Sequence, residues 1–361
     1  TPLPAQTAVP KKYRPKFSPD IINISIGYSS YWGPEGQGLV VVSDILGNHR
    51  MVFYGDLFYS LQNSNLQFVY YYLKRRTDYG AALFNFGNYY TTSQYGEYRW
   101  RVYGGALIVS RPFTRFSRID AELLSLTVKR DYYYWMPEAP GTMRCLLLEL
   151  SLANDTAIWG GTGPVNGSRS LVSVQHSLDL GKDSPSFTTL YFDHRRYLRM
   201  NKRYTFAFRL SGGASTGKDP QHFFVGGLDN WINAKYSRRE VSTIGDFYFA
   251  NFPTPLRGAS YYQLSGTRYL LANCEFRYPF IPYLSFGWPL PLRLRNIQGV
   301  LFTDAGSAWD GWPEEISRDM YLITWGFGVR INLGIVLLRF DNAWKSESSR
   351  PVSCFSLGAD F

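Results

Sequence analysis

The strongest constraint in this sequence is an alternation of apolar and polar residues along segments of about ten residues. In residues 321–332, large apolar side chains occupy every second position: Tyr321, Ile323, Trp325, Phe327, Val329 and Ile331. Small or polar residues fill the positions between them: Thr324, Gly326, Gly328, Arg330 and Asn332. Successive side chains of a strand point to opposite faces, so the alternation predicts a β-strand with one apolar and one polar face.

The same pattern repeats from residue 21 to the end of the chain, interrupted by turn residues. It predicts sixteen strands, at 21–31, 37–45, 49–60, 65–75, 79–88, 98–110, 115–130, 142–154, 168–180, 186–200, 203–214, 267–279, 296–306, 321–332, 334–345 and 352–361. Single-chain bacterial barrels have an even number of strands. No segment of useful length has the 3.6-residue period of an amphipathic helix.

Aromatic residues make up 17% of the chain, which suits a barrel whose apolar faces meet lipid. The longest uncharged apolar stretches, such as Gly105 to Val109, are far shorter than the roughly 20 residues of a membrane-spanning helix. Turns such as 77–80 are short, whereas 130–141 and 306–320 are long, an asymmetry typical of outer-membrane barrels. A soluble sandwich would also alternate, but it would hide its apolar face. The predicted fold class is all-β: a sixteen-stranded antiparallel transmembrane β-barrel.

The formal net charge is +10, yet Lys and Arg are scattered singly through strands and turns. No basic helix stripe and no zinc-finger spacing is present, so we expect no nucleic-acid partner. Basic turns beside the phosphates of lipid headgroups explain the charge instead. Cys145, Cys274 and Cys354 are an odd number without metal-binding spacing, and we interpret them as small apolar strand residues. We therefore expect no cofactor and no metal.

The domain organisation follows from where the alternation begins and where it breaks. Residues 1–20 are rich in proline and lysine and are predicted to be a periplasmic linker, and residues 21–361 to form the barrel. A long stretch without alternation, at about 215–266, is predicted to be a loop. No signal peptide opens the chain, so we expect a mature or trimmed form that lacks a periplasmic N-terminal part.

Two short patterns predict how that loop is held. Leu256-Arg257-Gly258 lies in the irregular stretch, and the strand predicted over 296–306 carries Phe302, Asp304 and Gly306 on one face. On the neighbouring predicted strand, Glu275 and Arg277 share the polar face. A guanidinium can hold a carboxylate with two parallel hydrogen bonds, so Arg257 is predicted to bind Asp304 or Glu275. Gly258 lets the backbone turn and Gly306 leaves room for it.

A different pairing is open at this point. Arg257 could be a solvated loop residue, with Asp304 paired to a polar-face arginine such as Arg330 or Arg339.

The two patterns resemble the signature of the BamA/TamA superfamily of outer-membrane barrels (bacterial surface antigen barrels). In that family a loop with an R-G tip folds into the barrel lumen and docks on an F-x-D-x-G strand. Three further segments resemble its motifs in the same order: 163–169 its P-x-x-G-S-R turn, 223–227 its F-x-x-G-G sequence and 273–279 its E-x-R-x-P strand. The chain departs from the pattern in two places. About thirty residues separate Gly227 from the tip, and Ala259 follows Gly258 where the family has an aromatic residue.

The resemblance implies a barrel in a Gram-negative-type outer membrane that takes part in inserting or translocating other proteins. It implies that the 215–266 loop lies in the lumen, and that the partners are membrane lipids, lipopolysaccharide and other envelope proteins in a larger complex. The last residues look like the family's C-terminal targeting signal, carried by Phe355, Leu357, Ala359 and Phe361. Segments 193–197 and 212–217 resemble the branch whose barrel follows a periplasmic β-propeller.

In this family the first and last strands meet at a seam that can open sideways. Here the seam would join 21–31 to 352–361. Gly27 and Gly358 would weaken pairing along it because they have no side chains to pack.

Other functions are less well supported by the sequence. His49, His176, His194 and His222 lie in no pattern with a nucleophile, and no G-x-S-x-G sequence occurs, so we expect no catalytic residues and no enzyme. A porin is conceivable, with the arginines at 209, 277, 330 and 339 favouring anions, but the loop would plug it. An anchor or scaffold of a larger envelope complex is the main alternative, with 227–256 and 132–135 as docking surfaces.

Overall fold

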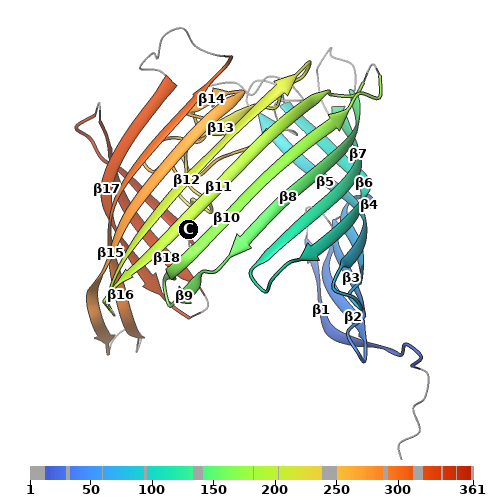
Figure 1. The fold of residues 1–361 in the computed structure, drawn as a ribbon, viewed down its shortest axis with the longest axis horizontal. Helices are drawn as coiled ribbons and strands as arrows, with labels where there is room; N and C mark the ends of the chain where they lie inside the picture. Colours follow the sequence, from blue (N-terminus) through green and yellow to red (C-terminus); the bar gives the residue numbers. More distant parts are fainter. Residues whose placement is uncertain are drawn as a thin grey trace, which may run out of the picture. The chain divides into compact units, whose positions relative to one another are not determined.

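The structure is a computed structural model in which strands dominate (Figure 1). It describes residues 13–29, 33–58, 60–92, 96–132, 141–181, 183–201, 203–237, 250–287, 292–311, 320–334, 336–346 and 348–358. Within these ranges no residue is assigned to an α-helix, and no helix is long and apolar enough to cross a membrane. The all-β prediction is therefore confirmed.

The strands have the following bounds: β1 Phe17–Ser29, β2 Gly33–Asp44, β3 His49–Phe58, β4 Ser60–Tyr72, β5 Asp78–Thr92, β6 Gly96–Pro112, β7 Ser117–Tyr132, β8 Thr142–Asp155, β9 Ile158–Gly160, β10 Gly163–Leu178, β11 Phe187–Met200, β12 Tyr204–Gly217, β13 Phe223–Val225, β14 Leu264–Gly266, β15 Arg268–Phe286, β16 Leu292–Trp309, β17 Tyr321–Asn332, β18 Leu337–Lys345 and β19 Val352–Leu357. Each predicted range overlaps one of these strands, although the bounds differ. A 17-stranded sheet takes in every strand except β13 and β14.

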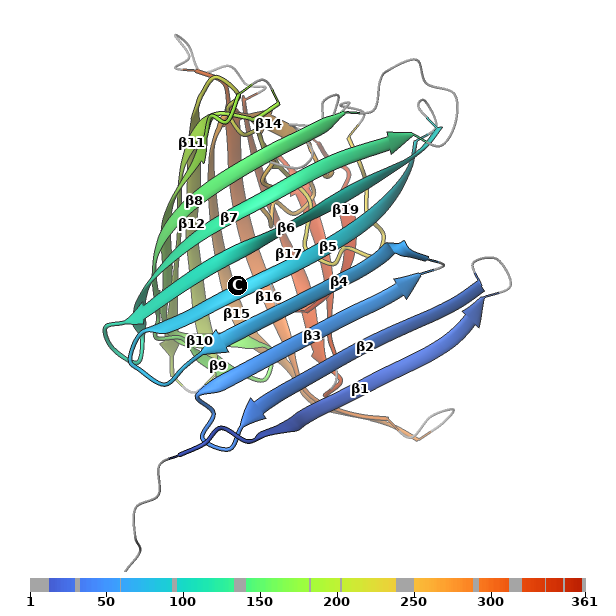
Figure 2. The same cartoon turned by 90° about the vertical axis from the view of Figure 1, so that its right-hand side faces the viewer.

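Two compact units divide the chain. The first comprises Thr1–Ser110 and Leu124–Met143. In it, β1 to β6 pair antiparallel in chain order, each strand with the next (Figure 2). Such neighbour-to-neighbour pairing is the arrangement that short turns between alternating segments produce.

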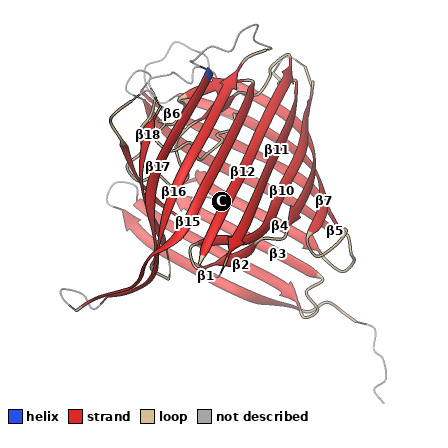
Figure 3. Cartoon of the chain, turned by 60° about the vertical axis from the view of Figure 1, so that its left-hand side comes forward, coloured by secondary structure: helices blue, strands red, loops and turns tan. Residues whose placement is uncertain are grey.

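The second unit comprises Arg111–Leu123 and Arg144–Phe361. Its antiparallel strands follow the order β8, β10, β11, β12, β15, β16, β17, β18 and β19. Figure 3 shows β10, β11, β12, β15, β16, β17 and β18 side by side. The short β9 pairs with the start of β10, and β13 pairs with β14 inside the long connection between β12 and β15.

Burial alternates along these strands as the sequence predicts. In β17, Trp325 is 55% exposed and Phe327 47% exposed, whereas Thr324 is fully buried. In β12, Phe208 and Leu210 are exposed while Arg209 and Ser211 are buried. The core of the second unit therefore lies on the polar face of its sheet, and the large apolar side chains are on the other face.

The ends of two strands, β15 and β1, differ from the prediction. The predicted strand 267–279 ends at Pro279, but β15 continues to Phe286. Proline cannot donate a ladder hydrogen bond, and the register with β16 shifts between Pro279 and Ile281 instead of the strand ending. At the other end of the chain, β1 begins at Phe17 rather than residue 21.

The cysteines lie where the sequence places them. Cys145, Cys274 and Cys354 are free thiols in β8, β15 and β19. The aromatic residues Tyr133, Tyr134 and Trp135 of the predicted long loop lie outside the described residues.

A glycine in β17 tests the close packing of the strands. A Cβ at Gly326 would lie 2.0 Å from the Asn342 backbone oxygen and 2.7 Å from the Phe302 ring. We expect Gly326→Ala to lower the free energy of unfolding by about 1–3 kcal/mol, the usual cost of overpacking. The change is measured as the temperature at which heating in detergent abolishes the electrophoretic mobility of the folded form.

Gly27→Ala in β1 is the matched control, because a Cβ there would meet no atom within 4 Å. Equal melting temperatures for the two variants would contradict the packing described for β17.

Candidate functional site

Residues 218–267 connect β12 to β15, and we call them the connecting segment. Its described parts, 218–237 and 250–267, contact the polar face of the second unit's sheet. Its buried residues Phe223, Val225, Leu256, Ala259 and Leu264 form one apolar cluster with Tyr269 and Leu271 of β15 and Ala308 of β16. Its hydrogen bonds reach from β12 to β19: Arg209 donates to the Thr254 carbonyl, and Leu357 of β19 donates to the Asn230 carbonyl. The segment is thus packed as core rather than exposed as an ordinary loop.

Arg257, at the tip of this segment, has a side chain that is 0% exposed. Its guanidinium holds Asp304 of β16 with two parallel hydrogen bonds, Nε to Oδ2 at 2.7 Å and Nη2 to Oδ1 at 2.7 Å. The Arg257 backbone N–H donates to the same carboxylate at 3.1 Å. A bidentate contact of this kind fixes the orientation of the tip as well as its position.

A second carboxylate, Glu275 of β15, completes the surroundings of Arg257. It accepts from Arg257 Nη1 and, at 2.7 Å, from Arg277 Nε. Arg330 approaches Glu275 at 3.8 Å and donates to Asp341 of β18 at 2.7 Å. The cluster therefore sets three guanidinium groups against three carboxylates, so the buried charge is balanced.

Neutral groups fill the remaining space around the arginine. The Arg257 guanidinium carbon lies 3.7 Å from the centre of the Phe302 ring, a cation–π distance. Asn273 donates to Asp304 at 2.8 Å and also to the Pro255 carbonyl at 2.8 Å. Burial acts to lower the pKa of Arg257, but the charges of Asp304 and Glu275 outweigh it and hold that pKa well above its usual value.

Two glycines make the close approach possible. Gly258 has a φ of +82°, and a Cβ on it would lie 2.9 Å from the Ala343 side chain. A Cβ on Gly306 would lie 2.8 Å from Leu256. Any side chain at either position would push the tip away from the sheet.

The structure brings together the six residues singled out for the loop-to-strand contact: Arg257, Gly258, Glu275, Phe302, Asp304 and Gly306. The alternative partners of Asp304 are engaged elsewhere, Arg330 with Asp341 and Arg339 with Ser356 and the Asp229 carbonyl. Of the residues assigned to a C-terminal signal, Phe355 and Leu357 lie in β19. Ala359 and Phe361 lie outside the described residues.

A second buried ion cluster was missed by the sequence reasoning. Asp193 of β11 accepts from Arg195 at 2.7 Å and from Arg209 of β12 at 2.6 Å, and Arg209 also binds the connecting segment at Thr254. The available signal was that Asp193 and Arg195 share the face of Tyr191 on an alternating strand. Arg277 likewise reaches a strand that is not its neighbour, donating at 2.9 Å to the Pro164 carbonyl of β10. The 163–169 segment, predicted as a turn, is the start of that strand.

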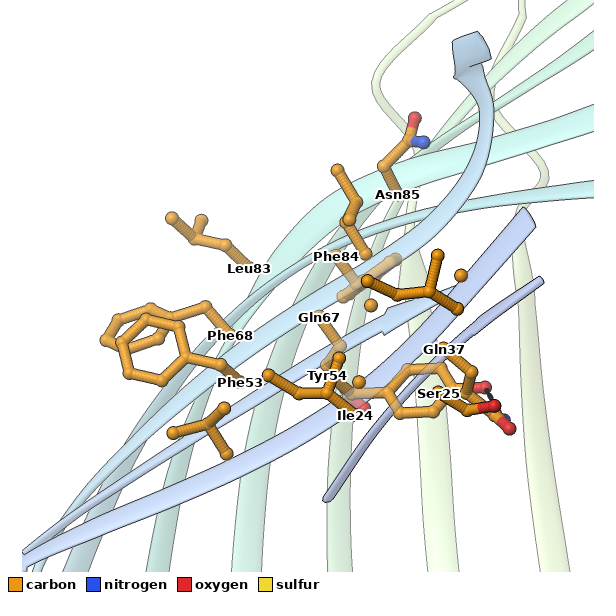
Figure 4. Close-up of a pocket in the computed structure, with 16 residues that line it drawn as sticks. Ile24, Ser25, Gln37, Phe53, Tyr54, Gln67, Phe68, Leu83, Phe84 and Asn85 are labelled. Atoms are coloured by element: carbon orange, nitrogen blue, oxygen red, sulfur yellow. Dashed lines mark hydrogen bonds between the residues drawn. The ribbon is translucent and has the colours of Figure 1, made fainter. Parts of the chain in front are cut away.

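A hollow of about 650 Å³ lies over β1 to β5 in the first unit. Figure 4 shows Phe53, Phe68 and Leu83 gathered on one side of these strands, with Ser25 and Gln37 on the other. The lining is mostly apolar and contains no charged residue; its polar side chains are those of Ser25, Gln37, Tyr54, Gln67 and Asn85. No group of three or more His, Cys, Asp and Glu that could hold a metal occurs in the described part of the chain.

Comparisons with known proteins agree with this geometry. Residues 54–361 match the Omp85 superfamily domain. The fold is similar to BamA from Haemophilus ducreyi lacking POTRA domains 1-3, with a TM-score of 0.62 at 14% identity over 97% of this chain and 71% of that one. It is also similar to CdiB from Escherichia coli, with a TM-score of 0.54 at 12% identity over 98% of this chain and 64% of that one.

CdiB from Acinetobacter baumannii gives a TM-score of 0.53 at 13% identity over 94% of this chain, which spans 60% of that protein. A comparison with curated proteins gives no significant match.

Removing the guanidinium tests the energetic role of the Arg257 cluster. Arg257→Ala leaves Asp304 and Glu275 buried with too little positive charge, so we expect the free energy of unfolding to fall by about 3–5 kcal/mol. The change is measured by heating samples in detergent to increasing temperatures and running them on a gel in the cold, which gives the temperature at which the folded form is lost.

Arg118→Ala is the matched control, because Arg118 pairs with Asp120 while its side chain is 60% exposed. An exposed pair contributes at most about 1 kcal/mol. If both arginine variants melt at the wild-type temperature, the buried cluster does not hold the connecting segment.

Proposed function

Because this chain belongs to the Omp85 superfamily, we propose that it takes part in inserting or translocating other proteins at the outer membrane. Proteins of this family sit in the Gram-negative outer membrane, transport or insert proteins rather than catalyse reactions, and work in envelope protein complexes. The chain is accordingly an outer-membrane protein.

We further propose that the long strands close into one sixteen-stranded barrel with the connecting segment, at about 215–266, in its lumen. The exposed apolar faces support this arrangement, since Leu148, Leu150 and Leu152 of β8 are each 49–50% exposed on one face. Such faces suit contact with lipid hydrocarbon. The residues before β1, which begins at Phe17 rather than after residue 20, would then be the periplasmic linker that leads into the barrel. A propeller before it stays a prediction.

The observation that carries the proposal is the way in which the connecting segment is held. Arg257 is anchored by Asp304 and Glu275 from two neighbouring strands, and Gly258 packs against Ala343 of β18. This contact makes the segment a fixed brace across β15 to β18 rather than a passive plug. A brace of this kind suits a barrel whose wall must keep its shape while another polypeptide binds at its edge or in its lumen. It also argues against a porin, whose lumen would have to be open.

Lipid contact is the second part of the proposal. The formal charge of +10 is spread over strands and turns, and the Lys and Arg of the turns can meet the phosphates of lipopolysaccharide and other headgroups. Each such contact adds modest attraction at the membrane surface. Together they would orient the barrel and keep it in place.

A scaffold function is the alternative, and one observation favours it. The connecting segment exposes large apolar side chains at Ile232, Tyr236 and Phe252, which are 55%, 65% and 40% exposed. Exposed aromatic residues of this kind are typical of protein-binding surfaces. The chain would then hold other envelope proteins at the membrane without acting on a client.

Depletion of the protein separates the two functions. If it inserts or translocates proteins, we expect outer-membrane proteomics after depletion to show loss of many barrel or surface proteins. Wild-type protein and Arg118→Ala restore them, whereas Asp304→Asn, which removes the charge that binds Arg257, restores them by at most about half.

The scaffold function predicts a different outcome. Barrel proteins stay at their normal levels, and a small set of periplasmic partners leaves the membrane fraction. That result would overturn the proposed function.

A further inference from the structure

The hollow over β1 to β5 has glycines at its floor. Gly38 of β2 and Gly55 of β3 are directly opposed in their antiparallel pair, and both line the hollow. Large apolar side chains surround them: Ile24, Ile26, Phe53, Leu66, Phe68 and Leu83 (Figure 4). The hollow is therefore a space between apolar side chains where two facing positions have none.

Strand packing does not require glycine at these two positions. A Cβ on Gly38 would lie 3.7 Å from the Ile24 side chain, and one on Gly55 would lie 3.5 Å from the Leu66 side chain. Both are ordinary van der Waals distances. At Gly104 of β6, by contrast, a Cβ would lie 2.0 Å from a backbone oxygen of β7. A strand glycine without a packing role often marks the close approach of a ligand.

The hollow opens on the exposed apolar face of the first unit's sheet. Ala82 of β5 is buried in an apolar cluster, whereas Leu83, the next residue along the strand, is 64% exposed on the opposite face. Phe53, Phe68 and Leu83 are successive cross-strand partners, so they share that face. In an outer-membrane barrel the exposed apolar face meets lipid hydrocarbon.

One end of the hollow is polar. Asn85 belongs to the lining and lies on the face of Leu83, two residues further along β5. Its Nδ2 donates to the Ser64 carbonyl at 2.9 Å, and its Oδ1 accepts from Arg101 Nε of β6 at 3.0 Å. Arg101 also lies over the Tyr103 ring, 5.6 Å from its centre. A guanidinium has five N–H donors, and the bond to Asn85 uses one of them while holding the group beside the hollow.

A second cation lies on the same face of the next strand, β7, which is hydrogen-bonded to β6. Leu124 packs with the buried cluster on the other face, and Val128, on the same side of β7, is 1% exposed. Lys129 follows Val128 and is exposed, so it lies on the face of the hollow. Arg101 is near the start of β6 and Lys129 near the end of β7, which places both at one end of the sheet.

That end carries a long connection. Residues 133–141 join β7 to β8 there, whereas only 113–116 join β6 to β7 at the opposite end. Outer-membrane barrels have short turns on the periplasmic side and longer loops outside. The two cations therefore lie toward the outer leaflet, and the hollow extends from them toward the middle of the membrane.

These features fit an amphiphile with an anionic head. Among the described residues that line the hollow none is charged, so its long axis suits a hydrocarbon chain. The volume of about 650 Å³ is within the usual range of pockets for small ligands. At the outer end, a guanidinium can bind a phosphate through two parallel hydrogen bonds.

We propose that this face binds one lipid of the outer leaflet, the phosphorylated lipid A part of lipopolysaccharide. An acyl chain occupies the hollow above Gly38 and Gly55, and a phosphate lies at Arg101, with Lys129 adding positive charge. This inference deepens the lipid contact of the proposed function. It rests on that function only for the placement of the strands in the membrane.

Filling the hollow tests the position of the acyl chain. Gly38→Val/Gly55→Val adds side chains where there is room for a Cβ, so the folded form should keep its heat resistance. We expect the full-length variant in detergent to bind lipid A at least about tenfold more weakly, because the new side chains occupy the space of the acyl chain. Native mass spectrometry with added bis-phosphorylated lipid A measures the affinity.

The matched control is Gly27→Val, since Gly27 of β1 is outside the lining and a Cβ there would meet no atom within 4 Å. It should bind lipid A as the wild type does. Equal affinity of the wild type and Gly38→Val/Gly55→Val would overturn the proposal.

Arg101→Gln tests the phosphate contact separately. We expect about a fivefold loss of affinity for bis-phosphorylated lipid A, the usual effect of one cation at a membrane surface, and no loss for lipid A without phosphates. Arg118→Gln, which removes an exposed arginine near the start of β7, is the control. An equal loss with both forms of lipid A would overturn the phosphate contact.

Two further measurements separate lipid A from other lipids and from the proposed function. Phosphatidylglycerol should bind more weakly than lipid A and be insensitive to these variants; equal binding and equal sensitivity would overturn the assignment to lipid A. If lipid A binding follows the variants while depletion of the protein affects no client, the proposed function fails and the lipid site stands. If depletion affects clients while the variants bind lipid A normally, only the lipid site fails.

Discussion

The structure depends on one guanidinium group that has been removed from water. Burying the Arg257 side chain completely is tolerable only because Asp304 and Glu275 surround it with charge and hydrogen bonds. Such a cluster contributes little net stability compared with apolar packing, but it is strongly selective for geometry, because any displacement leaves buried charges unpaired. The contact therefore specifies where the connecting segment lies more than it stabilises the fold. That specificity is what a brace across β15 to β18 requires.

Period-two alternation made the long strands and their faces predictable. The strands at 321–332 and 203–214 have a different environment on each face. The face on which a side chain lies follows from whether its position in the strand is odd or even. Strand ends were less predictable, because alternation does not show whether a strand stops at a proline. At Pro279 the pairing with β16 shifts register and the strand continues. The contact of Arg257 with Asp304 could be anticipated because both residues lie in short patterns with an obvious chemical fit. Asn273, which orients the same carboxylate, has no such pattern.

The contact of residues 229–234, the capping segment, with β19 could not have been predicted, for a related physical reason. Its bonds to β19 come mostly from the side chains of Asn230 and Asn233, and an asparagine in a loop normally signals a local turn. Only the tertiary position of β19 gives these amides their role as substitutes for peptide groups. The sequence did mark the place, however. The stretch of about thirty residues after Gly227 is where the chain departs from its family's pattern, and the cap lies in that stretch.

The brace and the cap belong to one mechanical unit. Asp229 in the cap is held by Thr254, which lies three residues before Arg257, and the Thr254 carbonyl in turn accepts from Arg209 of β12. Leu256 and Gly227 are joined by a backbone hydrogen bond of 3.0 Å, which closes the base of the capping region. These hydrogen bonds link residues 229–234 to the part of the connecting segment that carries Arg257, and the buried Trp231 packs the same residues against Cys354 of β19.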